Sequence, residues 1–244
     1  MVADAVNAMN RRLLRSFAAF ALGMLAFERL APAAEMPRGG RIAWARLITE
    51  SSSWSVHGAN DRVLADFIRT ETSLNVDPKC YAADPADLAQ LCAYPFIFTN
   101  NLTNVHDPRR LANLREYLRR GGFIYIDRCV NLSFSLEQEP FYARHVALFR
   151  SFLPGCEIRE LPENHEIHRC YFTLPPLNRG SSNSNHSGIY GVNFEGRLAV
   201  LLSCANLQCG WPNSPTRSAQ SKREIANIYV YAMTRGATGS AHSP

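Results

Sequence analysis

The sequence predicts an α/β domain in which a mostly parallel sheet lies between two layers of helices. Short apolar runs of strand length alternate with amphipathic segments of ten or more residues from residue 41 onward, which is the pattern of successive strand and helix units. The run YPFIFTN at 94–100 is almost continuously apolar, as expected for a strand buried on both faces of a parallel sheet. The 244 residues are 46% hydrophobic and 19% charged, a balance typical of one globular domain with a sizeable core.

The first half of this domain alternates strand and helix regularly. RIAWARLI at 41–48 is a predicted strand, and NDRVLADFIRTET at 60–72 is a predicted helix that begins at an Asn or Asp cap. A short strand around Val76 and a weak helical turn over 85–91 precede the strand at 94–100. Right-handed crossovers between these strands would place the helices on the faces of the sheet.

The clearest helix signal lies between residues 107 and 120. Asp107 is the expected cap and Pro108 the expected first residue, while Gly121 and Gly122 end the helix. The two glycines lead into the apolar strand FIYID, which ends at Asp127. Because a capping role explains Asp107, we interpret it as a structural residue rather than a catalytic one.

The second half is less regular. A helix is predicted over 140–152 and a strand over 156–162, followed by a polar loop at 177–188 that is either a lid or disordered. GIYGVNFEGRLAVLLSC is a predicted hairpin that turns at Glu195-Gly196. A closing helix is predicted over 218–234. These elements complete one α/β domain over 35–235, and the last nine residues form a predicted disordered tail.

Polar residues collect at one predicted edge of the sheet. If the strand order is flavodoxin-like, ligands approach the carboxyl ends of the first, third and fourth strands, where loops cover 49–60, 100–107 and 127–131. An exposed Trp54 could stack on a sugar, although a tryptophan that only anchors its loop is equally common. The edge is polar but nearly neutral, which suits a carbohydrate or another neutral ligand better than a phosphate. The candidate ligand-binding residues are Trp54, Asn60, Asn100, Asn101, Asp127, His165 and His168.

Cys129 follows the FIYID strand and has three interpretations. A nucleophile needs a nearby base, a tight turn between small residues and donors for an oxyanion. No G-x-C-x-G or G-x-S-x-G motif occurs in the chain, so a structural or disulfide-bonded cysteine is the favoured interpretation. A non-catalytic position at the edge of the sheet is the third. The weak catalytic candidates are Cys129, Asp127 and His165.

The segment ENHEIHRCYF at 163–172 carries two histidines three residues apart. On a helix His165 and His168 would share a face, whereas on a strand they would point to opposite sides. Alternating Ile167, Arg169 and Tyr171 predict extended structure, which weakens a shared metal site. One histidine could still form an acid/base or metal pair with Asp127. A histidine that satisfies a loop carbonyl is the simpler interpretation, and we expect neither a metal nor a cofactor.

Residues 1–34 have the features of an export signal. NRRLLRS is a basic start, FAAFALGMLAF is an eleven-residue apolar core and APAAE offers small residues for cleavage. Arg11-Arg12 resembles a twin-arginine signal; an ordinary secretory signal or an amphipathic surface helix are the alternatives. The apolar run is short for a bilayer span. We therefore predict a periplasmic or otherwise exported protein with no stable membrane span after signal removal.

The net charge and the cysteines limit the partners and the compartment. The first 34 residues carry +2 of the total charge of +5, so the remainder is too weakly basic to indicate nucleic acid. Seven cysteines could pair in an oxidising periplasm, with an odd one left over. Plausible pairs are Cys80 with Cys92, Cys156 with Cys170 and Cys204 with Cys209, which would leave Cys129 free.

Several segments, taken in order, resemble the bacterial domain-of-unknown-function family 4159 over about residues 41–234. They are Trp54 with a following AN pair, YPFIFTNN, LREYLRRGGFIYID, FLPGCEIRELPENHEIHRCYF, GIYGVNFEGRLAVLLS and ANIYVYAMTR. The family looks like the class I glutamine amidotransferase superfamily in fold. In that superfamily the nucleophilic cysteine follows the strand equivalent to FIYID.

The chain departs from the family pattern at acidic positions. Arg128 stands where the family has the second of two acids, and Asn206 stands where it usually has an Asp. His165 and His168 match an HPIYH-like segment in which Glu166 replaces proline. These departures favour a non-catalytic envelope module that binds a polar small molecule or docks a protein partner. The alternative is a degenerate or active amidotransferase-like or hydrolase-like enzyme that uses Cys129 or Asp127 with His165. A purely structural role in an envelope complex is a third possibility.

Overall fold

The computed structural model describes residues 41–56, 58–127, 138–175, 188–208 and 215–235. The predicted export signal at 1–34, most of the polar loop at 177–188 and the predicted tail at 236–244 lie outside the described residues. Cys129 and Cys209 lie outside them as well. Among the described helices, none is both long enough and apolar enough to cross a membrane.

The described residues form one seven-stranded sheet with the strand order β2-β1-β3-β4-β7-β6-β5. The β1–β2, β1–β3, β3–β4 and β4–β7 pairs are parallel, and β6 is antiparallel to both of its neighbours. The prediction of a mostly parallel sheet is therefore confirmed. The strands are β1 Ile42–Leu47, β2 Val76–Ala83, β3 Phe96–Thr99, β4 Phe123–Asp127, β5 Glu157–Glu160, β6 Ile189–Phe194 and β7 Arg197–Ser203.

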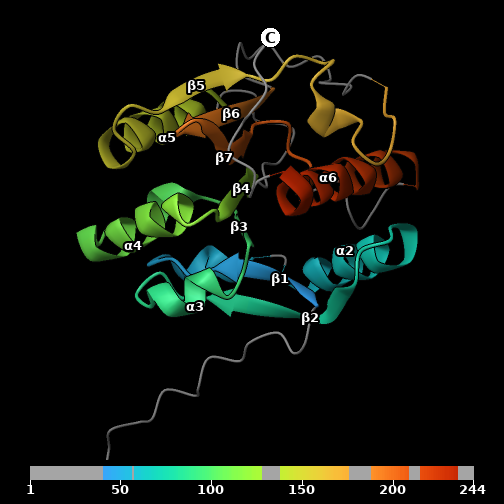
Figure 1. Cartoon of the computed structure of the whole chain (residues 1–244), viewed down its shortest axis with the longest axis horizontal. Coiled ribbons are helices and arrows are strands. Elements are labelled where there is room, and N and C mark those ends of the chain that lie inside the picture. The colour runs from blue at the N-terminus through green and yellow to red at the C-terminus, as the bar shows by residue number, and fades with distance from the viewer. Residues whose placement is uncertain (1–40, 57, 128–137, 176–187, 209–214, 236–244) are drawn as a thin grey trace, which may run out of the picture. The chain divides into compact units, whose positions relative to one another are not determined.

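Helices cover both faces of the sheet, which gives the predicted three layers (Figure 1). Helices α2 and α6 lie on one face and α3, α4 and α5 on the other (Figure 1). The α-helices are α2 Gly58–Glu71, α3 Leu88–Cys92, α4 Pro108–Arg119, α5 Gln138–Phe152 and α6 Pro215–Arg235. Short 3-10 helices are η1 Ser52–Ser55, η2 Leu102–Asn104 and η4 Glu166–His168.

Two local predictions are confirmed by backbone geometry. Asp107 caps α4 by accepting a hydrogen bond from the Arg109 amide at 2.7 Å, and Pro108 is the first helical residue. The hairpin between β6 and β7 turns at Glu195 and Gly196, which both have positive φ, 50° and 80°. Two positive φ values in a two-residue loop match the twist of the paired strands.

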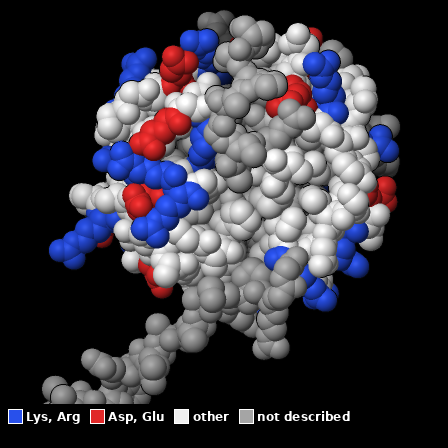
Figure 2. Space-filling model, in the orientation of Figure 1, with Lys and Arg blue, Asp and Glu red and all other residues white. Residues whose placement is uncertain are grey.

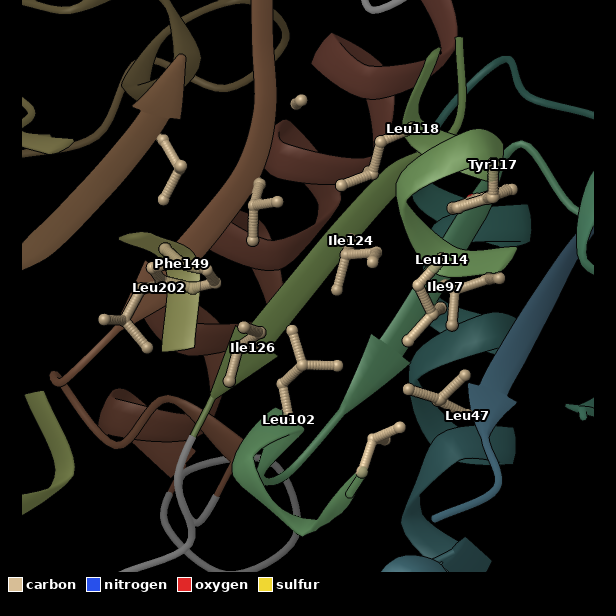
Figure 3. Packing of buried hydrophobic residues seen from close by; sticks show 14 of the residues in the cluster. Leu47, Ile97, Leu102, Leu114, Tyr117, Leu118, Ile124, Ile126, Phe149 and Leu202 are labelled. Carbon is tan, nitrogen blue, oxygen red and sulfur yellow. The ribbon is translucent and has the colours of Figure 1, made fainter. Parts of the chain in front are cut away.

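The side chains buried on the two faces of the sheet differ in type. On the α2 and α6 face, aromatic rings dominate, and the ring centroids of Phe96 and Tyr229 lie 4.8 Å apart. The opposite face is largely aliphatic, with Ile97 and Ile124 near Leu114 of α4 and Ile126 near Leu102 (Figure 3). Because successive strand residues point to opposite faces, near-continuous apolar strands were required to build both layers. The aromatic layer consists of Trp44, Phe96, Phe98, Phe123, Tyr125 and Tyr229.

A buried ion pair joins β1 to the start of α2. Arg46 and Asp61 are 3% and 2% exposed, and the Arg46 guanidinium donates to both carboxylate oxygens of Asp61, at 2.8 and 2.6 Å. The guanidinium carbon also lies 4.7 Å from the centroid of the Phe98 ring on β3. Bidentate geometry of this kind gives the strongest type of ion pair between side chains.

The same arginine also fixes the chain that follows β1. Its Nη1 donates to the backbone oxygens of Trp54 and Val56, at 3.2 and 3.1 Å, and to Oδ1 of Asn100 at 2.7 Å. Arg46 thus links β1, α2, the η1 loop and the carboxyl end of β3. We call these contacts the Arg46 network.

Two of the suggested disulfides are absent. Cys80, Cys92 and Cys156 are free thiols, so neither Cys80–Cys92 nor Cys156–Cys170 forms. Cys80 packs on the aromatic face and Cys156 on the aliphatic face, whereas Cys170 donates to the Asn227 oxygen of α6 at 3.1 Å. The sheet therefore separates Cys156 from Cys170, a relation that sequence spacing does not reveal.

We expect Arg46→Met to lower the free energy of unfolding by about 3–5 kcal/mol, because it leaves the Asp61 carboxylate buried without its partner. Urea denaturation measures this loss. The matched control is Arg69→Met, which breaks an ion pair with Asp66 whose side chains are 48% and 44% exposed and should cost less than about 1 kcal/mol. Equal losses in the two variants would contradict a central role for the Arg46 network.

Candidate functional site

The candidate site is the edge of the sheet at the carboxyl ends of its parallel strands, called the carboxyl edge below. In open α/β sheets, ligands bind at this edge and near the point where the strand order reverses. Here the order reverses between β1 and β3, because β2 and β3 lie on opposite sides of β1. The Arg46 network occupies this position. Its guanidinium is therefore engaged by Asp61 and Asn100 and is not available to a ligand.

The asparagines predicted to bind a ligand have local structural roles. Asn100 accepts from Arg46, and Asn101 caps η2 by accepting from the amide and the hydroxyl of Thr103, at 3.0 and 2.6 Å. Asn60 is half-buried in the first turn of α2. Trp54 is half-buried in η1, and its carbonyl accepts from Arg46. The structure thus places Trp54 and Asn100 around one guanidinium and leaves Asn60 beside them on α2.

Asp127 is the last residue of β4 and is fully buried, with 0% of its surface exposed. It lies opposite Ser203 of β7 in the sheet register. Its carboxylate oxygens accept from the amides of Leu207 and Gln208, at 3.2 and 2.5 Å. Burial raises the pKa of Asp127 to about 7, although hydrogen bonds from Ser203, Gln208 and Leu207 favour the charged form. Asp127 therefore fastens the chain after β7 to the end of β4.

That chain segment, 204–208, contains a left-handed residue and an unsatisfied buried amide. Asn206 is buried and has a φ of 57°, a conformation that asparagine adopts more readily than other non-glycine residues. Gln208 is 1% exposed, and neither polar atom of its side-chain amide has a hydrogen-bond partner within the described structure. Buried polar groups without partners are uncommon and call for a physical explanation.

The histidine segment differs from its predicted extended structure. Residues 166–168 form the 3-10 helix η4. This turn points the Ile167 side chain into the aromatic core, where it is fully buried. His165 caps this helix: its Nδ1 accepts from the Ile167 amide at 3.2 Å. His168 Nδ1 lies 2.6 Å from Oε1 of Glu224, which is 1% exposed and comes from α6.

The two histidines are therefore neighbours with different roles. Their ring centroids lie 6.4 Å apart, whereas opposite sides of a strand would have separated them. Burial lowers the pKa of His165, and the charges of His168 and Arg169 add to that effect. Because Nδ1 of neutral His165 accepts a hydrogen bond, its proton sits on Nε2, which is unsuited to bind a metal. No group of three or more potential metal ligands occurs among the described residues.

Glu224 and Asn227 of α6 hold the histidine segment against the aromatic layer. Asn227 is fully buried. Its Oδ1 accepts from the amides of Tyr171 and Phe172, at 3.3 and 2.8 Å, and its Nδ2 donates to the Phe172 carbonyl at 2.8 Å. The Asn227 side chain thus makes the hydrogen bonds that a neighbouring strand would otherwise make to the backbone of Tyr171 and Phe172.

Tyr125 connects the two halves of the site. Its pKa is raised well above the usual value, chiefly by burial, and also by the charges of Asp127 and Glu224. Both carboxyl groups therefore lie near one hydroxyl, beneath α6. We define Tyr125, Asp127, Ser203, Gln208 and Glu224 as the polar cluster.

The sequence pattern did not predict roles at this edge for four residues: Arg46, Ser203, Gln208 and Glu224. Glu224 and Asn227 are three residues apart, so they share the inward face of the closing helix with Ile228. Because polar residues on the apolar face of a helix need buried partners, the pattern could have predicted buried contacts for Glu224 and Asn227. Gln208 gave no signal, because it follows a strand in a segment without periodicity.

A family model for a domain of unknown function, DUF4159, matches residues 43–233. The chain belongs to the DUF4159 family. The match runs from β1 to the last turns of α6 and so includes the whole polar cluster. No curated protein matches this chain. The recognition of the family from its motifs is confirmed, while the description of DUF4159 assigns no activity that could be transferred.

The raised pKa of Asp127 predicts a stability change with pH. The folded state keeps the proton up to about pH 7, whereas the unfolded state loses it near its ordinary value of about 4. The folded state binds more protons between these values, so its stability falls as pH rises from about 4 to 7. We expect this DUF4159 protein to lose roughly 4 kcal/mol over that interval relative to Asp127→Asn.

Urea denaturation of both proteins at pH 4, 5.5 and 7.5 measures the difference. Subtracting the variant from the wild type removes the contributions of all other titrating groups. A difference that grows in favour of the wild type with rising pH would mean that the backbone amides outweigh burial.

Proposed function

We propose that this DUF4159 protein is an exported, non-catalytic module of the bacterial cell envelope that binds a neutral, polar small molecule at the carboxyl edge. The observation that carries this proposal is the buried side-chain amide of Gln208, which lacks partners in the described structure; the backbone amide of the same residue donates to Asp127. A buried donor or acceptor without a partner costs about 1–3 kcal/mol. A ligand that completes these hydrogen bonds would recover that energy.

The groups around Gln208 favour a neutral ligand. Among the described residues, Gln208 contacts the Asp127 carboxyl group through its backbone amide, and this group offers no positive charge to attract an anion. The guanidinium of Arg46 is taken by Asp61. A primary amide offers two donors and an acceptor side by side, so its natural complement is a group with a donor and an acceptor on adjacent atoms. Vicinal hydroxyls or an acetamido group of a sugar meet this requirement.

The proposed fold and location rest on further features. The order β2-β1-β3-β4 agrees with a flavodoxin-like or amidotransferase-like sheet, in which ligands bind at this edge. The basic start, apolar core and small residues of the first 34 residues support export. The substitutions Arg128 and Asn206 at family acidic positions support a non-catalytic site.

The decisive variant is Gln208→Met, which keeps the length of the side chain and removes its amide. If the amide serves a ligand, the free protein should gain about 1–2 kcal/mol of stability, because an unsatisfied group disappears. Thermal unfolding should therefore occur at a higher temperature. An amide with a structural role predicts the opposite sign, and a lower unfolding temperature would refute the proposal.

The ligand itself is tested by thermal shift with glucose and N-acetylglucosamine as neutral probes and inorganic phosphate as the charged control. We expect a neutral sugar to raise the unfolding temperature of the wild type and to leave Gln208→Met unchanged. A shift with phosphate alone would point to a different class of ligand.

An enzyme is the second candidate, because His168 is hydrogen-bonded to a buried carboxylate. A histidine oriented by Glu224 has the arrangement that activates a nucleophile in acyl-transfer enzymes. The nucleophile would be Cys129, which lies outside the described residues. The structure pairs His168 with the carboxylate, whereas the sequence favoured His165 for this role.

Alkylation of the full chain by iodoacetamide, read by peptide mass spectrometry, separates the two candidates. Cys92 is an exposed thiol and serves as the ordinary reference, while burial raises the pKa of Cys80 to about 12 and makes it the slow reference. The binding proposal predicts that Cys129 reacts no faster than Cys92 and that Glu224→Gln leaves its rate unchanged. A rate about tenfold above Cys92 that falls in Glu224→Gln would favour the enzyme.

A further inference from the structure

An apolar strip lies on the outer surface of α2 and of the segment that follows η4, on the face of the sheet that α2 and α6 cover. It consists of Val63 and Phe67, one turn apart on α2, and of Tyr171 and Phe172, which follow η4. Val63 is 45% and Tyr171 42% exposed, and only one other large hydrophobic side chain in the described structure is as open to solvent. We call these four residues the α2–α6 strip.

Ring contacts make the strip continuous. The Phe67 and Phe172 centroids lie 6.3 Å apart, and those of Tyr171 and Phe172 lie 4.9 Å apart. Asn227 fixes the backbone of Tyr171 and Phe172 through three hydrogen bonds. The strip is therefore held in place before any partner arrives, which lowers the entropic cost of binding.

Cations from α6 cover the aromatic rings of the strip. Lys222 Nζ lies 5.2 Å from the Phe67 centroid, and the Arg223 guanidinium carbon lies 5.7 Å from the Phe172 centroid. Neither cation forms an ion pair within the described structure, and the same holds for the exposed Arg62 of α2. Lysine and arginine side chains recur along the side of the molecule where α2 and α6 lie, with few acidic ones between them (Figure 2).

We propose that the α2–α6 strip docks an acidic segment of a partner protein that carries apolar side chains. Unpaired cations around an exposed, fixed apolar surface supply charge complementarity at the rim and a desolvated contact at the centre. Because Lys222 and Arg223 cover the ring faces, nucleic-acid bases cannot stack there. Phe67 and Phe172 are half-buried, so they offer little apolar surface for insertion into a lipid bilayer. This inference goes beyond the ligand site and does not depend on it.

The test uses the full chain and a fluorescein-labelled dodecapeptide built from Asp, Glu, Phe and Leu, with two acidic residues for each apolar one. A second peptide replaces every acid with lysine. Fluorescence anisotropy at two salt concentrations measures the affinities. We expect the acidic peptide to bind and to weaken as salt rises, and the basic peptide not to bind.

Two variants assign the binding to the strip. The double variant Lys222→Glu/Arg223→Glu should weaken binding by about tenfold or more, since two attractive charges become repulsive. Val63→Ser/Tyr171→Ser should weaken it by about fivefold through lost apolar contact. The matched control is Arg144→Glu/Arg150→Glu, which reverses two exposed arginines of α5 on the opposite face of the sheet and should change the affinity by less than about twofold. Circular dichroism confirms that each variant is folded.

Three results would overturn the proposal. One is failure of the acidic peptide to bind at concentrations up to about 1 mM. Another is equal weakening by the control on α5, which would show that only the net charge matters. The third is binding to phosphatidylglycerol vesicles that needs Lys222 and Arg223 while the peptide does not bind, which would assign the surface to a membrane.

Discussion

The bidentate ion pair between Arg46 and Asp61 sets the geometry of the carboxyl edge. Removing a guanidinium and a carboxylate from water is expensive unless each finds a well-placed partner. The two side chains meet this demand together, and the remaining guanidinium donors reach Trp54, Val56 and Asn100. One charge pair thus decides where α2 begins, how the η1 loop runs and where β3 ends. It also fills the position between β1 and β3 at which many α/β sheets bind their ligands.

The position between β1 and β3 is filled, and the buried Asp127 and Gln208 lie two strands away, between β4 and β7. Asp127 is buried and accepts hydrogen bonds from the backbone amides of Leu207 and Gln208, and Asn206 just before them has a left-handed conformation. A buried carboxyl group with a raised pKa and an unsatisfied buried amide are each uncommon. Their occurrence together distinguishes this part of the edge from the asparagines near β1 and β3, whose hydrogen bonds are satisfied locally.

The fold was largely predictable from the sequence because local rules govern most of it. Apolar runs, the Asp107 cap and the Glu195-Gly196 turn each act within a few residues, and the structure confirms them. The site was only partly predictable. Asp127 was recognised from its place at a strand end, but His168 meets Glu224 across 56 positions, and only the packing of α6 creates that contact. The extended prediction for 163–172 was wrong because burial of Ile167 outweighed the alternating pattern.

The strand order has a consequence for how the chain folds during synthesis. β4 lies in the middle of the sheet, yet one of its two neighbours is β7, which is the last strand in the sequence. Until β7 has left the ribosome, β4 exposes an unpaired, apolar edge of the kind that promotes aggregation. The helix that covers the aromatic face, α6, comes later still. The domain therefore cannot close its core until β7 and α6 have both been made.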